Sequence, residues 1–146
     1  MIETLAKTGI AHVIQLSVAP VFLLTGLGAI LNVMANRLAR IIDRARVLEL
    51  KLTGAEGESR AELEQRIARL SRRAHIISRS IAMCVVTAVL VCGVIITLFF
   101  GEFLTFEATV PAALLFIAAL LFFLLALVGL LREILLATAT LKFGPG

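Results

Sequence analysis

Apolar and polar residues along this chain separate into three long hydrophobic blocks and one charged stretch. The blocks cover residues 10–35, 76–100 and 108–131. Each block exceeds the ~20 residues that an α-helix needs to cross a hydrocarbon core of ~30 Å. The pattern therefore predicts an all-α membrane protein with three transmembrane helices, forming a single membrane domain over residues 1–146.

The charged stretch, residues 36–75, is predicted to form a helical hairpin outside the membrane. The first helix should continue past the membrane to Leu52, because neither Gly nor Pro interrupts the sequence there. The next six residues form a turn in which Gly54 supplies the left-handed residue after a helix end. Ser59 and Glu62 then make a capping box, which marks the start of the second arm.

The two arms carry apolar residues at alternating spacings of three and four positions. On the first arm these are Leu38, Ile42, Ala45, Leu48 and Leu52. On the second arm they are Leu63, Ile67, Leu70, Ala74, Ile77 and Ile81. This spacing is typical of coiled-coil seams, so the arms are predicted to pack as an antiparallel coiled coil.

Positive charge is concentrated in and beside the hairpin, where 11 of the 14 Lys and Arg lie between residues 36 and 79. Acidic residues accompany them, which is typical of a solvated helix surface, and no aromatic platform suggests nucleic-acid binding. Basic residues next to membrane spans set their orientation. We therefore expect a multi-pass protein of the inner (plasma) membrane, with the hairpin and the C-terminus in the cytoplasm. The N-terminus and the 101–107 turn lie outside.

Catalytic and metal-binding signatures are absent from the sequence. It contains no nucleophile–base set, no phosphate-binding loop and no metal-binding motif. The two histidines, His12 and His75, are far apart without ligand spacing. We expect no enzyme activity, no cofactor and no metal.

The first hydrophobic block carries a regular stripe of polar residues that continues into the hairpin. The stripe consists of His12, Gln15, Thr25, Asn32, Asn36, Arg40 and Asp43. On a helix supercoiled at 3.5 residues per turn they fall within a sector of about 100°. Polar side chains in a membrane turn toward protein or water rather than lipid. The stripe thus packs against the other two spans, or forms a contact between subunits, or lines a water-filled path between several copies.

Pro20 lies in the middle of the first span. It removes a backbone donor and leaves the Leu16 carbonyl without its helical partner, so a bend is expected there. A fixed structural bend and a functional hinge are both open.

The third span has a strip of small residues at seven-residue intervals, Ala112, Ala119 and Ala126, with Gly129 one turn further on. Such strips allow helices to pack closely in membranes. Beyond the strip, residues 131–143 alternate Arg132, Glu133 and Lys142 with apolar residues. This segment is expected to lie along the inner membrane interface.

Two segments carry a family resemblance. The first is IAHVIQLSVAPVFLL from Ile10 to Leu24, and the second is NRLARIIDRAR from Asn36 to Arg46. With their H-x-x-Q…P-x-F-L-L and R-L-x-R-x-x-D-R elements, they resemble the bacterial domain-of-unknown-function family 2721. The resemblance covers most of the chain. It implies a small multi-pass membrane protein and implies no activity or catalytic residues.

Two hypotheses for function follow, and both include contact with membrane lipid. In the first, the chain forms a homo-oligomer with an ion-channel or transport role, and the stripe lines its pore. In the second, it is a membrane-anchored structural or signalling module whose cytoplasmic hairpin binds a protein partner.

Overall fold

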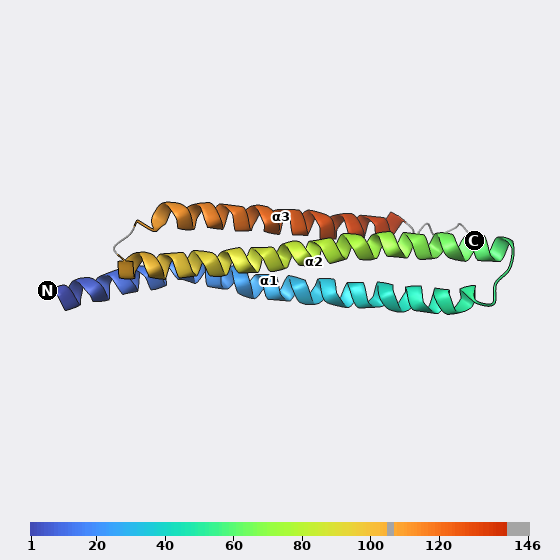
Figure 1. Cartoon of the computed structure of the whole chain (residues 1–146), viewed down its shortest axis with the longest axis horizontal. Helices are drawn as coiled ribbons and strands as arrows, with labels where there is room; N and C mark the ends of the chain where they lie inside the picture. Colours follow the sequence, from blue (N-terminus) through green and yellow to red (C-terminus); the bar gives the residue numbers. More distant parts are fainter. Residues whose placement is uncertain (105–106, 140–146) are drawn as a thin grey trace. The chain divides into compact units, whose positions relative to one another are not determined.

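The computed structural model of the chain describes residues 1–104 and 107–139, which form three long α-helices. They are α1 (Ile2–Leu52), α2 (Glu58–Leu104) and α3 (Thr109–Ala139), shown in Figure 1. Each helix is long and apolar enough to cross a membrane. The predicted all-α architecture is therefore confirmed, as is the end of the first helix at Leu52.

Helix α1 continues through Pro20 without a break. The proline lies on the buried side of the helix. The missing N–H leaves the helix one hydrogen bond short at this point, but its neighbours continue the helical pattern on both sides. The role of Pro20 as a hinge stays a prediction.

The turn between α1 and α2 differs in detail from the predicted one. Gly57, with φ of 63°, takes the left-handed conformation that was predicted for Gly54. The Gly57 carbonyl accepts hydrogen bonds from the backbone N–H groups of Arg60 and Ala61, at 3.2 and 3.4 Å, so the glycine caps the start of α2. The prediction that a Ser59–Glu62 capping box starts the helix is wrong, because α2 already includes Glu58 and Glu62 pairs with Arg66.

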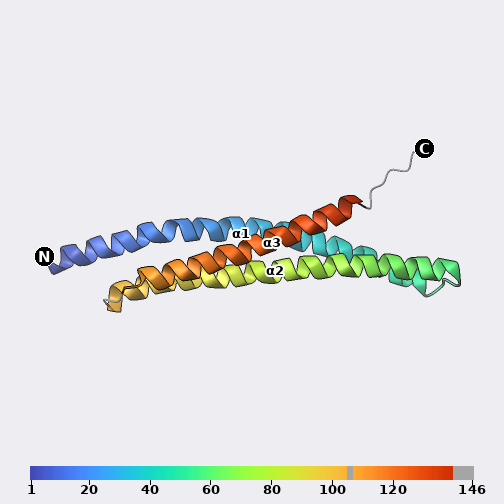
Figure 2. The same cartoon turned by 90° about the horizontal axis from the view of Figure 1, so that it is seen from above.

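The three helices contribute to two compact units. Unit 1 contains Met1–Ile30 and Met83–Leu124, and unit 2 contains Leu31–Ala82 and Leu125–Gly146. The hairpin belongs to unit 2, and the turn that joins its arms is visible in both Figure 1 and Figure 2. Each unit has its own buried residues.

In unit 1, α2 and α3 pack closely along small residues. Ala112 and Ala119 of the predicted strip are buried, with exposed fractions of 4% and 0%. The Thr87 hydroxyl is also buried, 2.9 Å from the Met83 carbonyl of its own helix and 3.3 Å from the Ala119 carbonyl of α3. Since alanine has only a methyl group, the α3 backbone approaches α2 closely enough for this contact.

In unit 2, the same strip continues at Ala126, which is fully buried. One turn further on, Gly129 faces Ser80 of α2, and a Cβ atom built on the glycine would lie 3.4 Å from the Ser80 Cβ and closer still to its hydroxyl. Glycine is therefore the residue that fits this helix contact. The strip is confirmed as a close-packing surface in both units.

The hairpin arms in unit 2 are in contact, but one predicted seam residue is displaced. Ile41 is 5% exposed, whereas Ile42, the predicted seam residue, is 40% exposed. Ile77 of the second arm is fully buried, as expected. Ile41 lies seven positions after Met34, which is fully buried, so the two residues lie on the same side of α1. At this point the residue that faces inward is Ile41, one position before the residue predicted for the seam.

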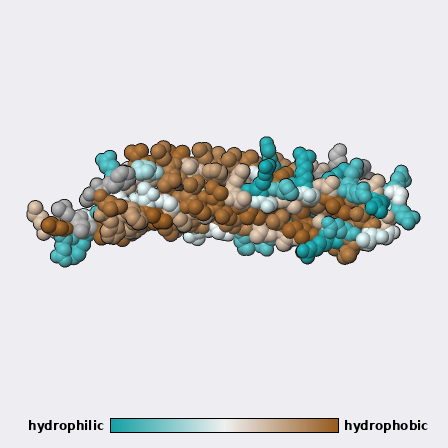
Figure 3. All heavy atoms as spheres, in the orientation of Figure 1, coloured by the Kyte–Doolittle hydropathy of each residue, from teal (hydrophilic) through white to brown (hydrophobic). Residues whose placement is uncertain are grey.

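Large apolar side chains cover the outside of the long helices. In Figure 3 hydrophobic residues dominate the surface of the apolar helix segments, and hydrophilic residues gather on the charged hairpin. Exposed examples on α3 include Leu114, Leu121 and Leu125, at 64%, 57% and 52%. Such an extent of exposed apolar surface is typical of helices whose solvent is hydrocarbon.

Candidate functional site

The polar stripe predicted from the sequence lies on the exposed side of α1. In unit 1 the exposed members are His12, Gln15 and Thr25. In unit 2 they are Asn32, Asn36, Arg40 and Asp43. All seven predicted residues therefore share one surface property, and none of them is part of a buried core.

The buried residues of α1 define the opposite side of the helix. In unit 1, Val13 and Leu27 are buried, and Gln15 follows Val13 by two positions. In unit 2, Met34 and Ile41 are buried, and Asn36 and Asp43 follow them by two positions. Two residues correspond to a rotation of about 200° around the helix axis. Gln15, Asn36 and Asp43 thus point away from the helices that cover the buried side of α1. Arg40 precedes Ile41 by one position, about 100° around the helix, and it also lines a pocket with Arg73 and Glu133.

Hydrogen bonds of the stripe stay within α1. The Asn36 side-chain amide donates to the Asn32 side-chain oxygen at 3.4 Å, and the Thr25 hydroxyl donates to the Val21 carbonyl at 3.3 Å. The buried hydroxyls of α2 bond elsewhere: Ser80 donates to the Ile76 carbonyl at 3.1 Å, and Thr87 donates to the Met83 carbonyl at 2.9 Å. The exposure of the stripe residues within the first hydrophobic block, His12, Gln15, Thr25 and Asn32, does not fit packing against the other helices of their own units.

A second polar site, which the sequence analysis missed, is centred on Glu133 of α3. This carboxylate is completely buried in unit 2. Its Oε2 atom lies 2.6 Å from an Arg37 guanidinium nitrogen of α1, and its Oε1 atom lies 2.6 Å from an Arg73 guanidinium nitrogen of α2. One carboxylate thereby connects three helices.

Each arginine binds the carboxylate through more than one contact. Arg37 Nε donates a hydrogen bond to Oε2 at 2.7 Å, and Arg73 Nε donates to Oε1 at 3.3 Å. Each guanidinium thus places two nitrogens on a single oxygen, Arg37 on Oε2 and Arg73 on Oε1, through charge-assisted hydrogen bonds. Glu133 is held between two forks, which satisfies both of its oxygens and allows it to remain buried.

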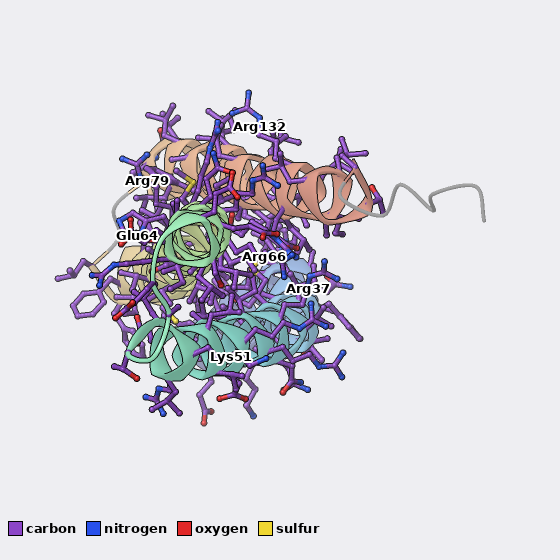
Figure 4. The ribbon with its side chains drawn as sticks, turned by 90° about the vertical axis from the view of Figure 1, so that its right-hand side faces the viewer. Arg37, Lys51, Glu64, Arg66, Arg79 and Arg132 are labelled. Atoms are coloured by element: carbon purple, nitrogen blue, oxygen red, sulfur yellow. The ribbon has the colours of Figure 1, made fainter. Side chains whose placement is uncertain are left out.

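The neighbouring residue, Arg132, has a different environment. It is exposed, and Figure 4 shows it pointing away from α1 and α2. The expectation that residues 131–143 lie along the interface is therefore wrong for Glu133, which faces inward. Lys142 lies outside the described residues. The signal that places Glu133 inside is the heptad from Ala126, since Ala112, Ala119, Ala126 and Glu133 are each seven positions apart and all buried.

Beside the carboxylate, unit 2 contains a small pocket with a basic wall. It has a volume of about 170 Å³ and is lined by Arg37, Arg40, Ile41, Arg44, Arg73 and Glu133. Four arginines and one glutamate line the pocket, which gives its lining a formal net charge of +3. The pocket therefore favours anions.

A larger groove of about 320 Å³ runs between the hairpin arms. Its apolar lining includes Ile41, Ile42, Ile67 and Leu70, and Arg46 and Glu49 add polar groups. Within residues 1–104 and 107–139, no cluster of His, Cys, Asp and Glu has an arrangement that could hold a metal ion.

A family model described as a protein of unknown function, DUF2721, matches residues 17–143 of the chain. The chain belongs to the DUF2721 family. The match includes the buried Glu133 and both of its arginine partners, and it confirms the resemblance noted in the sequence. Among curated proteins and among solved structures, none matches this DUF2721 chain.

Proposed function

We propose that this DUF2721 protein assembles in the membrane as a homo-oligomer, in which the polar stripe of α1 lines an aqueous path for ions. The observation that carries the proposal is the exposure of the stripe on the side of α1 opposite its buried residues. Amide and imidazole groups facing lipid would lose their hydrogen bonds to water without replacement. Contact with other copies, or with water enclosed between them, removes this cost.

The number of helices supports self-assembly. The described part of the chain has three helices that could cross a membrane, and a single copy offers one polar face rather than a ring of them. Several copies arranged around an axis would bring their stripes together, with Gln15 and Asn32 as wall residues of the path. The small residue Gly26 lies within the same sector and would allow close approach.

Conductance measurements on purified protein in planar bilayers test the proposal. The protein should conduct ions, and Asn32→Leu should change the conductance because it replaces a polar wall residue. Ala35→Leu is the matched control, since Ala35 is also exposed but lies outside the stripe. Silent bilayers containing well-folded oligomer, or a monomeric mass in detergent and nanodiscs, would refute the proposal.

The proposed orientation places the hairpin in the cytoplasm of a cell whose inner membrane holds the three spans. Its support is the concentration of Arg between the first two spans. A membrane-impermeant thiol reagent should fail to label a Glu56→Cys variant in intact cells and should label it after lysis. Labelling from outside would reverse the orientation.

The groove between the hairpin arms supports a second candidate function, a structural or signalling module that binds a protein partner through an antiparallel coiled-coil hairpin. Ile42 lines this groove and is 40% exposed. Ile42→Glu should abolish capture of the partner from a cell extract. Val47→Glu, at an exposed position outside the groove lining, should leave the capture intact.

A further inference from the structure

We propose that the pocket beside Glu133 binds a phosphate group, and that the phosphate belongs to the headgroup of an anionic membrane lipid or to a soluble phosphate. The inference does not depend on the proposed pore, because the pocket lies within one copy of unit 2. Three features of the pocket favour a phosphate: unbalanced positive charge, a suitable size and a position at the ends of the hydrophobic segments.

The charges of the pocket are only partly balanced by the protein. Glu133 pairs with Arg37 and Arg73. Arg40 and Arg44 also line the pocket, and among the described residues no carboxylate lies within ion-pair distance of either one. Asp43, next to Arg44, forms no ion pair with any described residue either. Two guanidinium groups therefore remain available for an external anion.

The spacing of the arginines along α1 brings their charges together. Arg37, Arg40 and Arg44 are separated by three and four positions, which places them on one side of a helix. Like charges at this spacing repel each other, and Arg73 adds a further positive charge from α2. A bound anion would relieve this repulsion, and the planar forks of Arg suit phosphate oxygens in particular.

The volume of the pocket fits a phosphate group. Its 170 Å³ corresponds to about five or six water molecules at roughly 30 Å³ each. A phosphate group has five non-hydrogen atoms, so the pocket is large enough to hold it. The wall is predominantly polar, which distinguishes this pocket from the apolar grooves elsewhere in the two units.

The pocket residues lie close to the ends of the hydrophobic blocks, where the headgroups of a bilayer would be. The first hydrophobic block ends at residue 35, two positions before Arg37. The second begins at residue 76, three positions after Arg73, and the third ends at residue 131, two positions before Glu133. The residues of the pocket thus lie where all three apolar segments meet water, which is where the phosphates of a bilayer lie. Basic pockets between helices at this level bind anionic headgroups.

The lipid arm of the test uses native mass spectrometry of the full chain purified from nanodiscs. Phosphatidylglycerol should remain bound at one molecule per chain, whereas phosphatidylcholine should not be retained. The double variant Arg40→Gln/Arg44→Gln should weaken the retention by about twenty-five-fold, since each basic residue near an anionic surface contributes roughly a factor of five. Both residues are exposed, so the fold should persist, which circular dichroism checks.

The soluble arm uses inorganic phosphate in a neutral detergent. If the pocket takes soluble phosphate, millimolar phosphate should raise the melting temperature of the wild type but not of the double variant, and no phosphatidylglycerol should be retained. If the pocket takes the lipid, retained phosphatidylglycerol should resist displacement by the same phosphate concentration. Either result supports the phosphate site and identifies its source.

Two variants control for charge and for folding. Lys51→Gln/Arg69→Gln removes two positive charges from exposed positions of unit 2 outside the pocket, and it should bind as the wild type does. Arg40→Lys/Arg44→Lys keeps the charge without the planar fork, and it should retain intermediate binding. Absence of binding in both arms, or equal loss in the charge control, would overturn the proposal.

Discussion

Glu133 on α3 and Arg37 on α1 are 96 positions apart in the sequence, yet the carboxylate accepts a hydrogen bond of 2.7 Å from the arginine Nε. The carboxylate is fully buried, whereas the Arg37 side chain is 34% exposed. Because the carboxylate has lost its hydration, it depends on its arginine partners for compensating hydrogen bonds. Arg37, in contrast, still reaches water. This contact, together with that of Arg73, connects the three helices in unit 2.

Glu133→Gln should destabilise the protein by about 3 kcal/mol, because it removes one member of a buried ionic cluster and leaves two arginines facing a neutral group. Reversible unfolding in a detergent titration, followed by circular dichroism, measures the change. Arg132→Gln is the matched control at an exposed neighbouring position, and its effect should stay within about 0.5 kcal/mol. Equal stability of Glu133→Gln and the wild type would mean that the cluster contributes little.

Ala119→Leu should destabilise unit 1 by about 1–3 kcal/mol, because its larger side chain must enter a close helix contact. Ala119 is fully buried, and its carbonyl lies 3.3 Å from the Thr87 hydroxyl. Ala113→Leu, at an exposed position of the same helix, should be tolerated. The melting temperatures of the two variants in detergent compare the two sites directly, and a similar decrease in both would contradict close packing at Ala119.

Gly57→Ala should destabilise the hairpin turn by about 1–2 kcal/mol, because a Cβ atom is strained in the left-handed conformation. Gly57 has a φ of 63°, and space is not the cause, since nothing lies within 4 Å of the built Cβ. Gly54→Ala is the control, because Gly54 also has open space but lacks the positive φ. Proteolysis at the turn, or a thermal melt, should separate the two variants. A larger effect at Gly54 would restore the original sequence prediction.

The sequence predicted the long helices well, but it predicted the contacts between residues far apart in the chain poorly. Both outcomes have physical reasons. The end of α1 at Leu52 follows from local helix-breaking residues, which act within a few positions. The choice between Gly54 and Gly57 depends on how the arms close, so local sequence does not decide it. The heptad of Ala112, Ala119 and Ala126 did contain the position of Glu133. A charged residue usually signals a solvated face, and only its pairing with Arg37 and Arg73 allows burial here.

For the polar stripe, too, the sequence predicts the shared face but not what contacts it. Its periodicity indicated a shared face on α1, and Gln15 in unit 1 and Asn32 in unit 2 are both exposed, so the other helices of those units do not cover them. What covers it in the membrane depends on other molecules. A test of the stripe therefore needs a variant that is silent in a single copy and visible only when copies meet.

Gly26→Leu provides such a test of the proposed assembly. A Cβ atom on Gly26 would meet nothing within 4 Å, so the larger side chain should leave a single copy unaffected. Gly26 lies in the sector of the stripe, where helices of neighbouring copies would approach each other closely, and a leucine there should prevent that approach. The oligomer should therefore dissociate in native mass spectrometry while the helix content stays unchanged.

Gly28→Leu is the matched control for this variant. It adds the same side chain two residues away, also with nothing within 4 Å, but outside the sector of the stripe. The control should keep the mass of the wild-type assembly, because the added leucine faces away from the proposed contact. If both variants retain the assembly, then α1 does not supply the contact between copies. If both lose it, the effect belongs to the whole exposed surface of α1 rather than to its polar face.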